Sequence, residues 1–285
     1  GVVSDIDIPI AYTDYAKEAV LKSVKDPETN MRIKTIYHGV DTNIFKPLDP
    51  YERRREREKL GIQDKFVFLT VSRNQSRKNI PELFRAWKMF TDIPGIADDA
   101  VFWPHMNFKD QAGWDIDDLI TVCGLRNRTI MYYEQVAHPK SEAFGIADEE
   151  LAKLYQLADA FILLSNEGFG LPVLEAMATK LPCILLGHSA TAEIGKDGRS
   201  ALIDPSGSVT WVGRYLTDKP VPDIKKTADV MYKIMKDKKY RDEIALKGYE
   251  FAKQTTWEHA LNEWDAVFKK IEFPYLSPME MEVVV

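Results

Sequence analysis

Short runs of apolar residues alternate with amphipathic segments through most of the 285-residue chain. The apolar runs have four to six residues and lack regular polar alternation, as expected for strands buried on both faces of a sheet. The segments between them carry apolar residues at helical spacing. Strands that alternate with helices are typical of a parallel sheet that helices cover on both faces. The pattern therefore predicts an α/β fold with a doubly wound, Rossmann-like parallel sheet and a helical C-terminal extension.

The predicted strands cover residues 8–12, 33–37, 66–71, 100–103, 129–132, 160–164, 183–186 and 200–203. The predicted helices cover residues 15–24, 51–60, 80–90, 114–123, 148–157, 172–178, 191–194, 224–236, 239–253 and 257–271. In a doubly wound sheet, ligands bind beyond the carboxyl ends of the strands. The loops at those ends are therefore where functional residues are expected.

The loop after strand 160–164 has the composition of an anion site. Residues 165–172 read SNEGFGLP. Pro172 suits the first turn of a helix, whose free backbone N–H groups and positive dipole end attract phosphate, and the two glycines let a ligand approach the backbone. Glu167 and Glu175 flank the helix start and could accept hydrogen bonds from sugar and ribose hydroxyls. The alternative is a capped helix with acidic residues near its N-terminus.

A second polar loop, residues 72–79, follows strand 66–71 and carries three cations. Arg73 could bind a phosphate through its forked guanidinium, and Lys78 could act as a point charge. Together they would stabilise a departing diphosphate. Arg77 is given a weaker part because its side chain could face solvent. The alternative is a polar loop with exposed cations.

The segment from Glu167 to Ala176 resembles the E-x7-E signature of retaining GT-B glycosyltransferases of family 4, in which seven residues separate two glutamates. Arg73 and Lys78 resemble the Arg and Lys pair of that family at the equivalent strand end. The resemblance covers residues 35–272 and implies the C-terminal, donor-binding half of a GT-B enzyme. The implied domains are 1–45, a remnant of the acceptor domain with the linker; 46–255, the nucleotide-sugar domain; and 256–285, a crossover helix and tail.

The resemblance implies an enzyme of the hexosyltransferase type. It would move a sugar from a nucleotide-sugar co-substrate, such as a UDP- or GDP-sugar, to a hydroxyl group with retention of configuration and without a metal ion or other cofactor. The implied catalytic residues are Glu167, Arg73 and Lys78. The implied donor-binding residues are Arg73, Lys78, Glu167, Gly168, Phe169, Gly170, Leu171 and Glu175. The acceptor would be a glycan, a lipid-linked molecule or a small molecule, and its domain is expected to be missing or supplied elsewhere.

Two other functions stay open at this point. The same fold also hosts sugar-nucleotide epimerases, so fold alone does not decide between isomerisation and transfer. Because the acceptor domain is incomplete, the chain could also be a non-catalytic module that binds a nucleotide sugar. The spacing of Glu167 and Glu175 favours transfer.

Other polar segments also fall near predicted strand ends. His105 and Asn107 could line the same cleft or be structural. The acidic run 115–118 looks like a metal motif, but acids are also favoured at a helix start, which we regard as the better interpretation. Residues 131–135 lie where the family holds the nucleotide base through backbone contacts. Residues 187–194 resemble the family's segment in which small residues and a glutamate shape the donor pocket.

Charge and composition narrow the class of protein. A net charge of −6 and a pI near 5.5 give no electrostatic footprint for nucleic acid or an anionic membrane. The basic run 53–59 has mixed signs within a short helix and is interpreted as a solvated surface. No apolar run is as long as a membrane helix and no secretion signal is recognised. With Cys123 and Cys183 interpreted as reduced thiols, we expect a cytoplasmic protein and leave a peripheral membrane location open.

Overall fold

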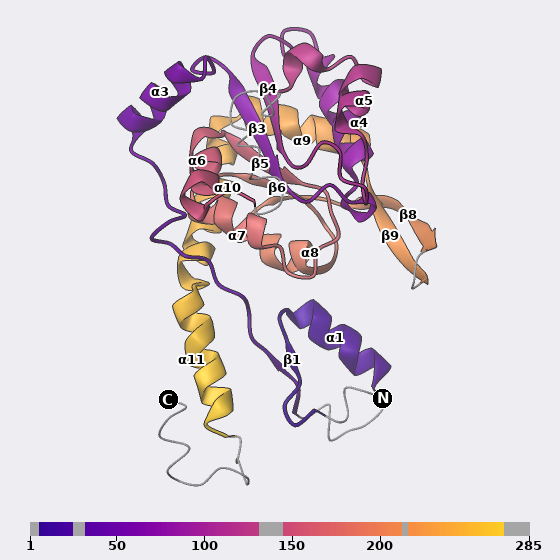
Figure 1. Cartoon of the computed structure of the whole chain (residues 1–285), viewed down its shortest axis with the longest axis vertical. Helices are drawn as coiled ribbons and strands as arrows, with labels where there is room; N and C mark the ends of the chain where they lie inside the picture. The colour runs from indigo at the N-terminus through magenta and orange to yellow at the C-terminus, as the bar shows by residue number, and fades with distance from the viewer. Residues whose placement is uncertain (1–5, 25–31, 131–144, 213–215, 271–285) are drawn as a thin grey trace.

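The computed structural model describes residues 6–24, 32–130, 145–212 and 216–270 and has a larger and a smaller part (Figure 1). The larger part is built on a five-stranded sheet with the order β4-β3-β5-β6-β7, and all of its strand pairs are parallel. These strands are β3 (Phe66–Val71), β4 (Ala100–His105), β5 (Ala160–Leu163), β6 (Cys183–Leu186) and β7 (Ala201–Ile203). The predicted α/β fold and parallel sheet are confirmed.

Helices cover both faces of this sheet because successive strand residues point to opposite sides. Val67 and Leu69 pack on one face with α6 and α7, whereas Phe68 between them packs on the other face with α4, α5 and α9. The described helices of this part are α3 (Pro50–Lys59), α4 (Ile80–Thr91), α5 (Ile116–Val122), α6 (Asp148–Leu157), α7 (Leu171–Ala178), α8 (Ser189–Gly195), α9 (Ile224–Lys236) and α10 (Lys238–Gln254). Each matches a helix expected from the apolar spacing, with ends that differ by no more than two residues.

The strand order creates a topological switch point between β3 and β5. The chain leaves β3 toward β4 on one side and returns to β5 on the other side, where Phe68 and Leu69 pair with Ala160 and Phe161. The loops after β3 and β5 therefore leave neighbouring strands in opposite directions, at the point where ligands bind in open α/β sheets. This arrangement brings the two polar loops predicted from the sequence together.

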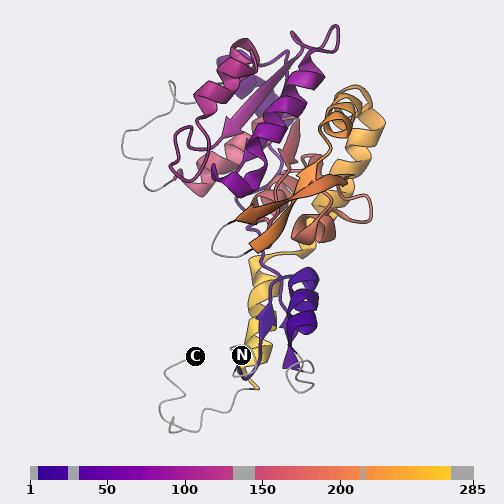
Figure 2. The same ribbon diagram turned by 90° about the vertical axis from the view of Figure 1, so that its right-hand side faces the viewer.

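Two features differ from the sequence prediction. The strand expected at residues 129–132 is described only as far as residue 130, and no strand forms there. Thr129 makes a single bridge to Phe102, directly after a short 3₁₀ turn at residues 126–128. An antiparallel hairpin of β8 (Pro205–Val212) and β9 (Leu216–Pro222) was not predicted. It projects from the sheet (Figure 2). The hairpin begins at Pro205 and ends at Pro222, and prolines in a sequence count against the prediction of a strand.

The smaller part consists of β1 (Ile10–Ala11), α1 (Asp14–Ser23) and β2 (Lys34–Thr35), with β1 parallel to β2. α11 (Trp257–Phe268) extends from the same end of the larger part (Figures 1 and 2). The segment around residues 39–40, between the smaller and the larger part, crosses the segment at residues 255–257 that leads into α11. The Val40 N–H donates to the Thr255 carbonyl at 3.0 Å, and a Cβ on Gly39 would lie 2.0 Å from the Trp257 nitrogen. Only glycine fits at that crossing.

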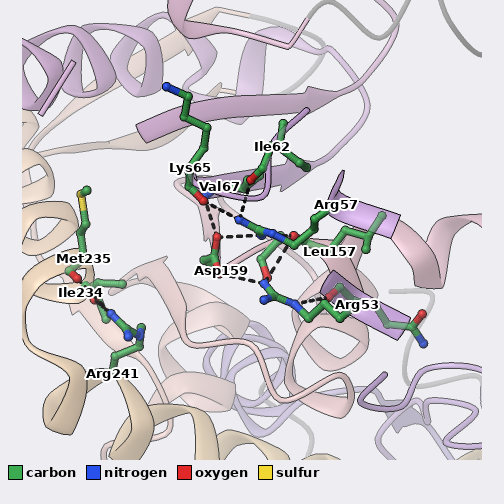
Figure 3. Close-up of polar contacts among 12 residues, drawn as sticks. Arg53, Arg57, Ile62, Lys65, Val67, Leu157, Asp159, Ile234, Met235 and Arg241 are labelled. Atoms are coloured by element: carbon green, nitrogen blue, oxygen red, sulfur yellow. Dashed lines mark hydrogen bonds and ion pairs between the residues drawn. The ribbon is translucent and has the colours of Figure 1, made fainter. Parts of the chain in front are cut away.

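Two arginines of α3 bind the larger part at the amino end of β5 (Figure 3). Arg57 is 4% exposed, and its guanidinium pairs with Asp159 at 2.9 Å and donates to the Ile62 carbonyl at 3.0 Å. Arg53, one helical turn earlier, reaches the other oxygen of Asp159 at 2.8 Å. Asp159 also accepts the Val67 N–H at 2.8 Å, so it connects α3, β3 and β5.

The interpretation of the basic run as a solvated surface is therefore only partly right. Arg54 and Glu58 form an exposed pair on the outer face of α3, as expected. Arg53 and Arg57 are four residues apart and so share the inner face of the same helix. Side-chain charge alone did not separate the two faces, because an arginine can be buried when backbone carbonyls and a carboxylate satisfy its donors. Among the described residues, no helix has the length and apolarity needed to cross a membrane.

The Arg57 contacts predict a large effect on stability. Arg57→Ala should lower the free energy of unfolding by about 3 kcal/mol, because it leaves buried carbonyls and part of Asp159 without their donors. Arg54→Ala is the matched control and should leave stability nearly unchanged, since exposed ion pairs contribute little. Urea unfolding followed by circular dichroism measures both. Equal stability of the two variants would contradict a structural role for Arg57.

Candidate functional site

Lys78 and Glu167 meet at the switch point of the sheet. Lys78 ends a 3₁₀ turn, Ser76–Lys78, that follows β3, and Glu167 lies in the loop after β5. The ammonium and the carboxylate form an ion pair, and their side chains are only 9% and 11% exposed. The Ser165 hydroxyl donates to the same carboxylate oxygen as Lys78. Glu167 is therefore held by groups from both loops.

A second cation converges on the same carboxylate. Arg77 Nη1 lies 3.5 Å from Glu167 Oε2 and donates to the Asn166 carbonyl at 3.0 Å. Burial lowers the pKa of Lys78, and the negative charge of Glu167 opposes that effect. Two cations against one carboxylate leave this corner with a net positive charge. Such a corner can bind an anionic group.

Arg73 lies apart from this cluster. Its guanidinium Nε donates to Asp110 at 2.9 Å, and its side chain is 66% exposed. Of the three cations in the loop, the structure thus brings Lys78 and Arg77 to Glu167, while Arg73 faces Asp110. Sequence reasoning had ranked Arg77 below Arg73, because nothing in the residue order shows which way a short 3₁₀ turn points its side chains.

Asn79 and the unpredicted hairpin brace the loop that carries Lys78. Asn79 has a left-handed backbone with φ of 51°, and its amide donates to the Leu164 carbonyl at 2.8 Å and to the Pro220 carbonyl of β9 at 3.1 Å. Lys219 of β9 donates to the Ser76 carbonyl at 2.7 Å. These residues were missed, although an asparagine directly before a helix is a signal for such a turn.

Helix α7 starts beside this cluster without a side-chain cap. Gly170 occupies the N-cap position with φ of 103°, a left-handed conformation that glycine adopts without strain, and makes no side-chain cap. Pro172 lies in the first turn, where its missing N–H costs nothing. Leu171 is 37% exposed. The backbone N–H groups at this end are suited to an anion.

Phe169 and Gly168 face the smaller part of the molecule. Phe169 is 5% exposed, and its ring lies 4.9 Å from His38 and 5.7 Å from Tyr37, measured between ring centroids. A Cβ on Gly168 would lie 2.9 Å from the Tyr12 hydroxyl. A donor could therefore contact Phe169 only through its backbone, since its side chain is packed between the two parts.

Glu175 lies on α7 in a partly buried environment. Its Oε2 accepts a hydrogen bond from the Tyr155 hydroxyl at 2.7 Å. Burial raises the pKa of Glu175, and the hydrogen bond from Tyr155 opposes part of that increase. The two glutamates of the predicted signature therefore differ in their partners. Glu167 is paired with cations, whereas Glu175 is paired with a neutral donor.

Glu193 joins the two parts of the molecule. Its carboxylate accepts the N–H groups of Asp14 and Tyr15 at 2.9 and 2.8 Å, at the first turn of α1, and also the Tyr37 hydroxyl. The sequence resemblance had given the glutamate of this segment a part in shaping the donor pocket. In the structure the carboxylate of Glu193 instead caps a helix of the smaller part.

The remaining candidates have structural partners. Asp115 accepts the Asp118 N–H at 3.1 Å and caps α5, as its position at a helix start suggested. Asn107 accepts the Lys109 N–H at 2.8 Å. His105 ends β4, and burial lowers its pKa. In the part of the chain that the structure describes, no three His, Cys, Asp or Glu side chains are grouped to hold a metal ion. Residues 131–135, expected near the base, lie outside the described residues.

Comparisons with known proteins agree with this architecture. Residues 142–251, which include the Glu167 loop and α7, match the family of glycosyl transferases group 1. The D-inositol 3-phosphate glycosyltransferase of a Nocardioides species is 26% identical over 283 residues, which are 94% of this chain and 55% of that protein. The GDP-mannose-dependent alpha-(1-6)-phosphatidylinositol monomannoside mannosyltransferase of Mycolicibacterium smegmatis is 28% identical over 194 residues, which are 63% of this chain and 46% of that protein.

A solved structure shows the same fold. Anabaena HepE in complex with UDP and glucose superposes with a TM-score of 0.70 at 20% identity, over 93% of this chain and 63% of that one. The chain spans about half the length of the curated relatives it matches.

The raised pKa of Glu175 predicts a pH-dependent change in stability. A carboxyl whose pKa is higher in the folded state stabilises the fold only while protonated, so its contribution is lost as pH rises through the folded pKa. Glu175→Gln removes the buried charge and keeps an oxygen for Tyr155. At about pH 7.5 it should raise Tm by roughly 1–3 °C, and the gain should shrink as pH falls toward the ordinary carboxyl range.

Differential scanning calorimetry over that pH range tests this expectation. Glu149→Gln, at an exposed position on α6, serves as the control and should leave Tm nearly unchanged at every pH. A gain for Glu175→Gln that is independent of pH, or a loss at neutral pH, would contradict the burial of this carboxylate.

Proposed function

We propose that this chain, which is similar in sequence and fold to GT-B glycosyltransferases, is the donor-binding part of an enzyme that transfers a sugar from a nucleotide to a hydroxyl group. The observation that carries the proposal is the buried Lys78–Glu167 ion pair at the switch point, next to the uncapped start of α7. A cationic corner, a helix start and a fixed carboxylate suit the diphosphate and the sugar of one donor.

The diphosphate would bind at the start of α7 with Lys78 and Arg77. Lys78 comes from the β3 side of the switch point and the N–H groups of α7 from the β5 side, so both would act on the same leaving group. Charge on the diphosphate grows as its bond to the sugar breaks, and fixed cations stabilise that state most. Arg73 stays in the proposed set, because its exposed side chain is long enough to exchange Asp110 for a phosphate.

Glu167 would orient the sugar, and Glu175 would accept the ribose hydroxyls. Lys78 and Ser165 both hold Oε1 of Glu167, which makes this carboxylate a poor nucleophile. We therefore propose a positioning role for it. The anomeric carbon would lose its bond to the phosphate oxygen, with the electron pair left on the diphosphate. It would gain a bond to the acceptor oxygen, whose proton passes to the departing diphosphate, with configuration retained and without a metal ion.

The relatives support transfer over the two other functions considered. Both relatives are glycosyltransferases, which favours neither an epimerase nor a non-catalytic module. The nucleotide base differs among these proteins, since one relative depends on GDP-mannose and one solved structure contains UDP. We propose a glycan, lipid-linked or small-molecule hydroxyl as acceptor.

A donor screen tests the proposed function directly. One of the UDP-, GDP- or ADP-sugars should raise Tm by several degrees, because a ligand that binds only the folded state stabilises it. With that donor carrying a radiolabelled sugar, the enzyme should release nucleoside diphosphate and transfer the labelled sugar to an acceptor or to water. EDTA should leave the rate unchanged. An altered free sugar nucleotide would indicate an epimerase, binding without turnover would indicate a module, and loss of activity in EDTA would refute the metal-free reaction.

The cations should affect turnover more than donor binding. Lys78→Ala should lower kcat by about 10²-fold while weakening donor binding much less, since the leaving-group charge develops in the transition state. Arg77→Ala and Arg73→Ala should show smaller losses of the same kind. Lys225→Ala, at an exposed residue of α9 that pairs with Asp229, is the control. Steady-state kinetics and calorimetric donor affinity separate the two effects, and equal losses in both would contradict the assignment.

A further inference from the structure

Tyr155 is a buried polar residue that the proposed chemistry has not yet used. It lies on α6, is 0% exposed, and donates its hydroxyl to Glu175 Oε2 at 2.7 Å. Its ring packs against Phe161 at 5.7 Å and Phe45 at 6.0 Å, measured between ring centroids. A hydroxyl at the end of a ring packed this closely has little freedom to move. The position of Glu175 is therefore coupled to the packing of α6 on α7.

The chemistry of Tyr155 and Glu175 determines the direction of the hydrogen bond between them. A carboxylate can only accept hydrogen bonds, and a neutral phenol can donate one. Burial raises the pKa of Tyr155 well above its ordinary value, which keeps the phenol protonated and a donor. Because Tyr155 occupies Oε2, the other oxygen, Oε1, is the one left for a ligand.

A purely structural role does not explain why the partner is a carboxylate. The Tyr155 hydroxyl needs one acceptor, and a backbone carbonyl or an amide oxygen would supply it without a buried charge. A partly buried carboxylate costs free energy that such an acceptor would avoid. The raised pKa of Glu175 reflects that cost. A group kept in an unfavourable environment is expected to serve a ligand.

We propose that Tyr155 is a positioning residue that holds the Glu175 carboxylate in the orientation needed to accept the ribose hydroxyls of the donor nucleotide. This inference rests on the proposed function, in which Glu175 binds the ribose. It adds that the affinity for the ribose depends on a side chain on α6 that itself never touches the nucleotide. Without the phenol, the Glu175 carboxylate is free to rotate. Ordering it when the ribose binds then costs conformational entropy, which weakens nucleotide binding.

The test compares nucleotides with and without the ribose hydroxyls. UDP and GDP are titrated by calorimetry, each beside its 2′,3′-dideoxy counterpart, into the native protein and Tyr155→Phe. For whichever base binds, Tyr155→Phe should lower the affinity for the ribonucleotide by about tenfold, which corresponds to the free energy of one hydrogen bond. It should lower the affinity for the dideoxynucleotide by less than about twofold. Tyr232→Phe on α9, where the side chain is 42% exposed, is the matched control and should change neither.

Two outcomes would overturn the inference. Equal weakening of both nucleotides would mean that Tyr155 only supports the fold, and an unchanged ribonucleotide affinity would mean that Glu175 needs no positioning. Circular dichroism and Tm establish that Tyr155→Phe is folded. If it is not, Tyr155→Met, which keeps an apolar side chain without a donor, takes its place in the same comparison.

Glu175→Ala separates this inference from the proposed function. If Glu175→Ala leaves the ribonucleotide affinity unchanged, the ribose role of Glu175 fails and the inference fails with it. If Glu175→Ala weakens only the ribonucleotide while Tyr155→Phe changes nothing, the ribose role stands and only the positioning role is refuted. In a double-mutant cycle, Tyr155→Phe should add less than about twofold to the loss caused by Glu175→Ala, because it acts through that carboxylate.

Discussion

The ion pair between Lys78 and Glu167 is the interaction on which the site depends. The two residues are 89 positions apart in the chain and are nearly buried where they meet. They meet because β3 and β5 are neighbours in a parallel sheet whose order reverses between them. A buried ion pair requires good geometry and further polar partners. The Ser165 hydroxyl supplies a hydrogen bond, and Arg77 supplies a second ion pair with the other oxygen of Glu167. The strand order thus brings the two polar loops, with the charges they carry, to one place.

Around this pair, the fold gives two glutamates on one loop–helix unit different environments. Glu167 is surrounded by cations and a hydroxyl, while Glu175 is held by a single neutral phenol from α6. The cations around Glu167 hold its carboxylate in place, which suits a position next to a diphosphate. A partly buried carboxylate with one hydrogen-bond donor is stabilised when it accepts further hydrogen bonds from ligand hydroxyl groups. The same residue type can therefore bind the sugar and the ribose of one ligand.

The loop that carries Glu167 also packs against the smaller part of the molecule. Phe169, one residue beyond the loop's Gly168, packs on His38 and Tyr37 of the linker, and Glu193 of α8 caps the first turn of α1. The two crossing chain segments at Gly39 fix the linker against the start of α11. A change in the angle between the two parts would therefore act on the loop that carries Glu167.

The sequence by itself determined the parallel sheet, its helices and the two polar loops, because buried strands, helical spacing and proline or glycine signals are local. It also assigned Lys78 and Glu167 to two loops at strand ends, and these two residues meet in the structure. Only the tertiary structure decided that Arg77 rather than Arg73 reaches Glu167, that β9 braces Asn79, and that Tyr155 holds Glu175. Each of these contacts joins elements from different strands and helices. Their geometry follows from how the layers pack, which no local pattern of residues encodes.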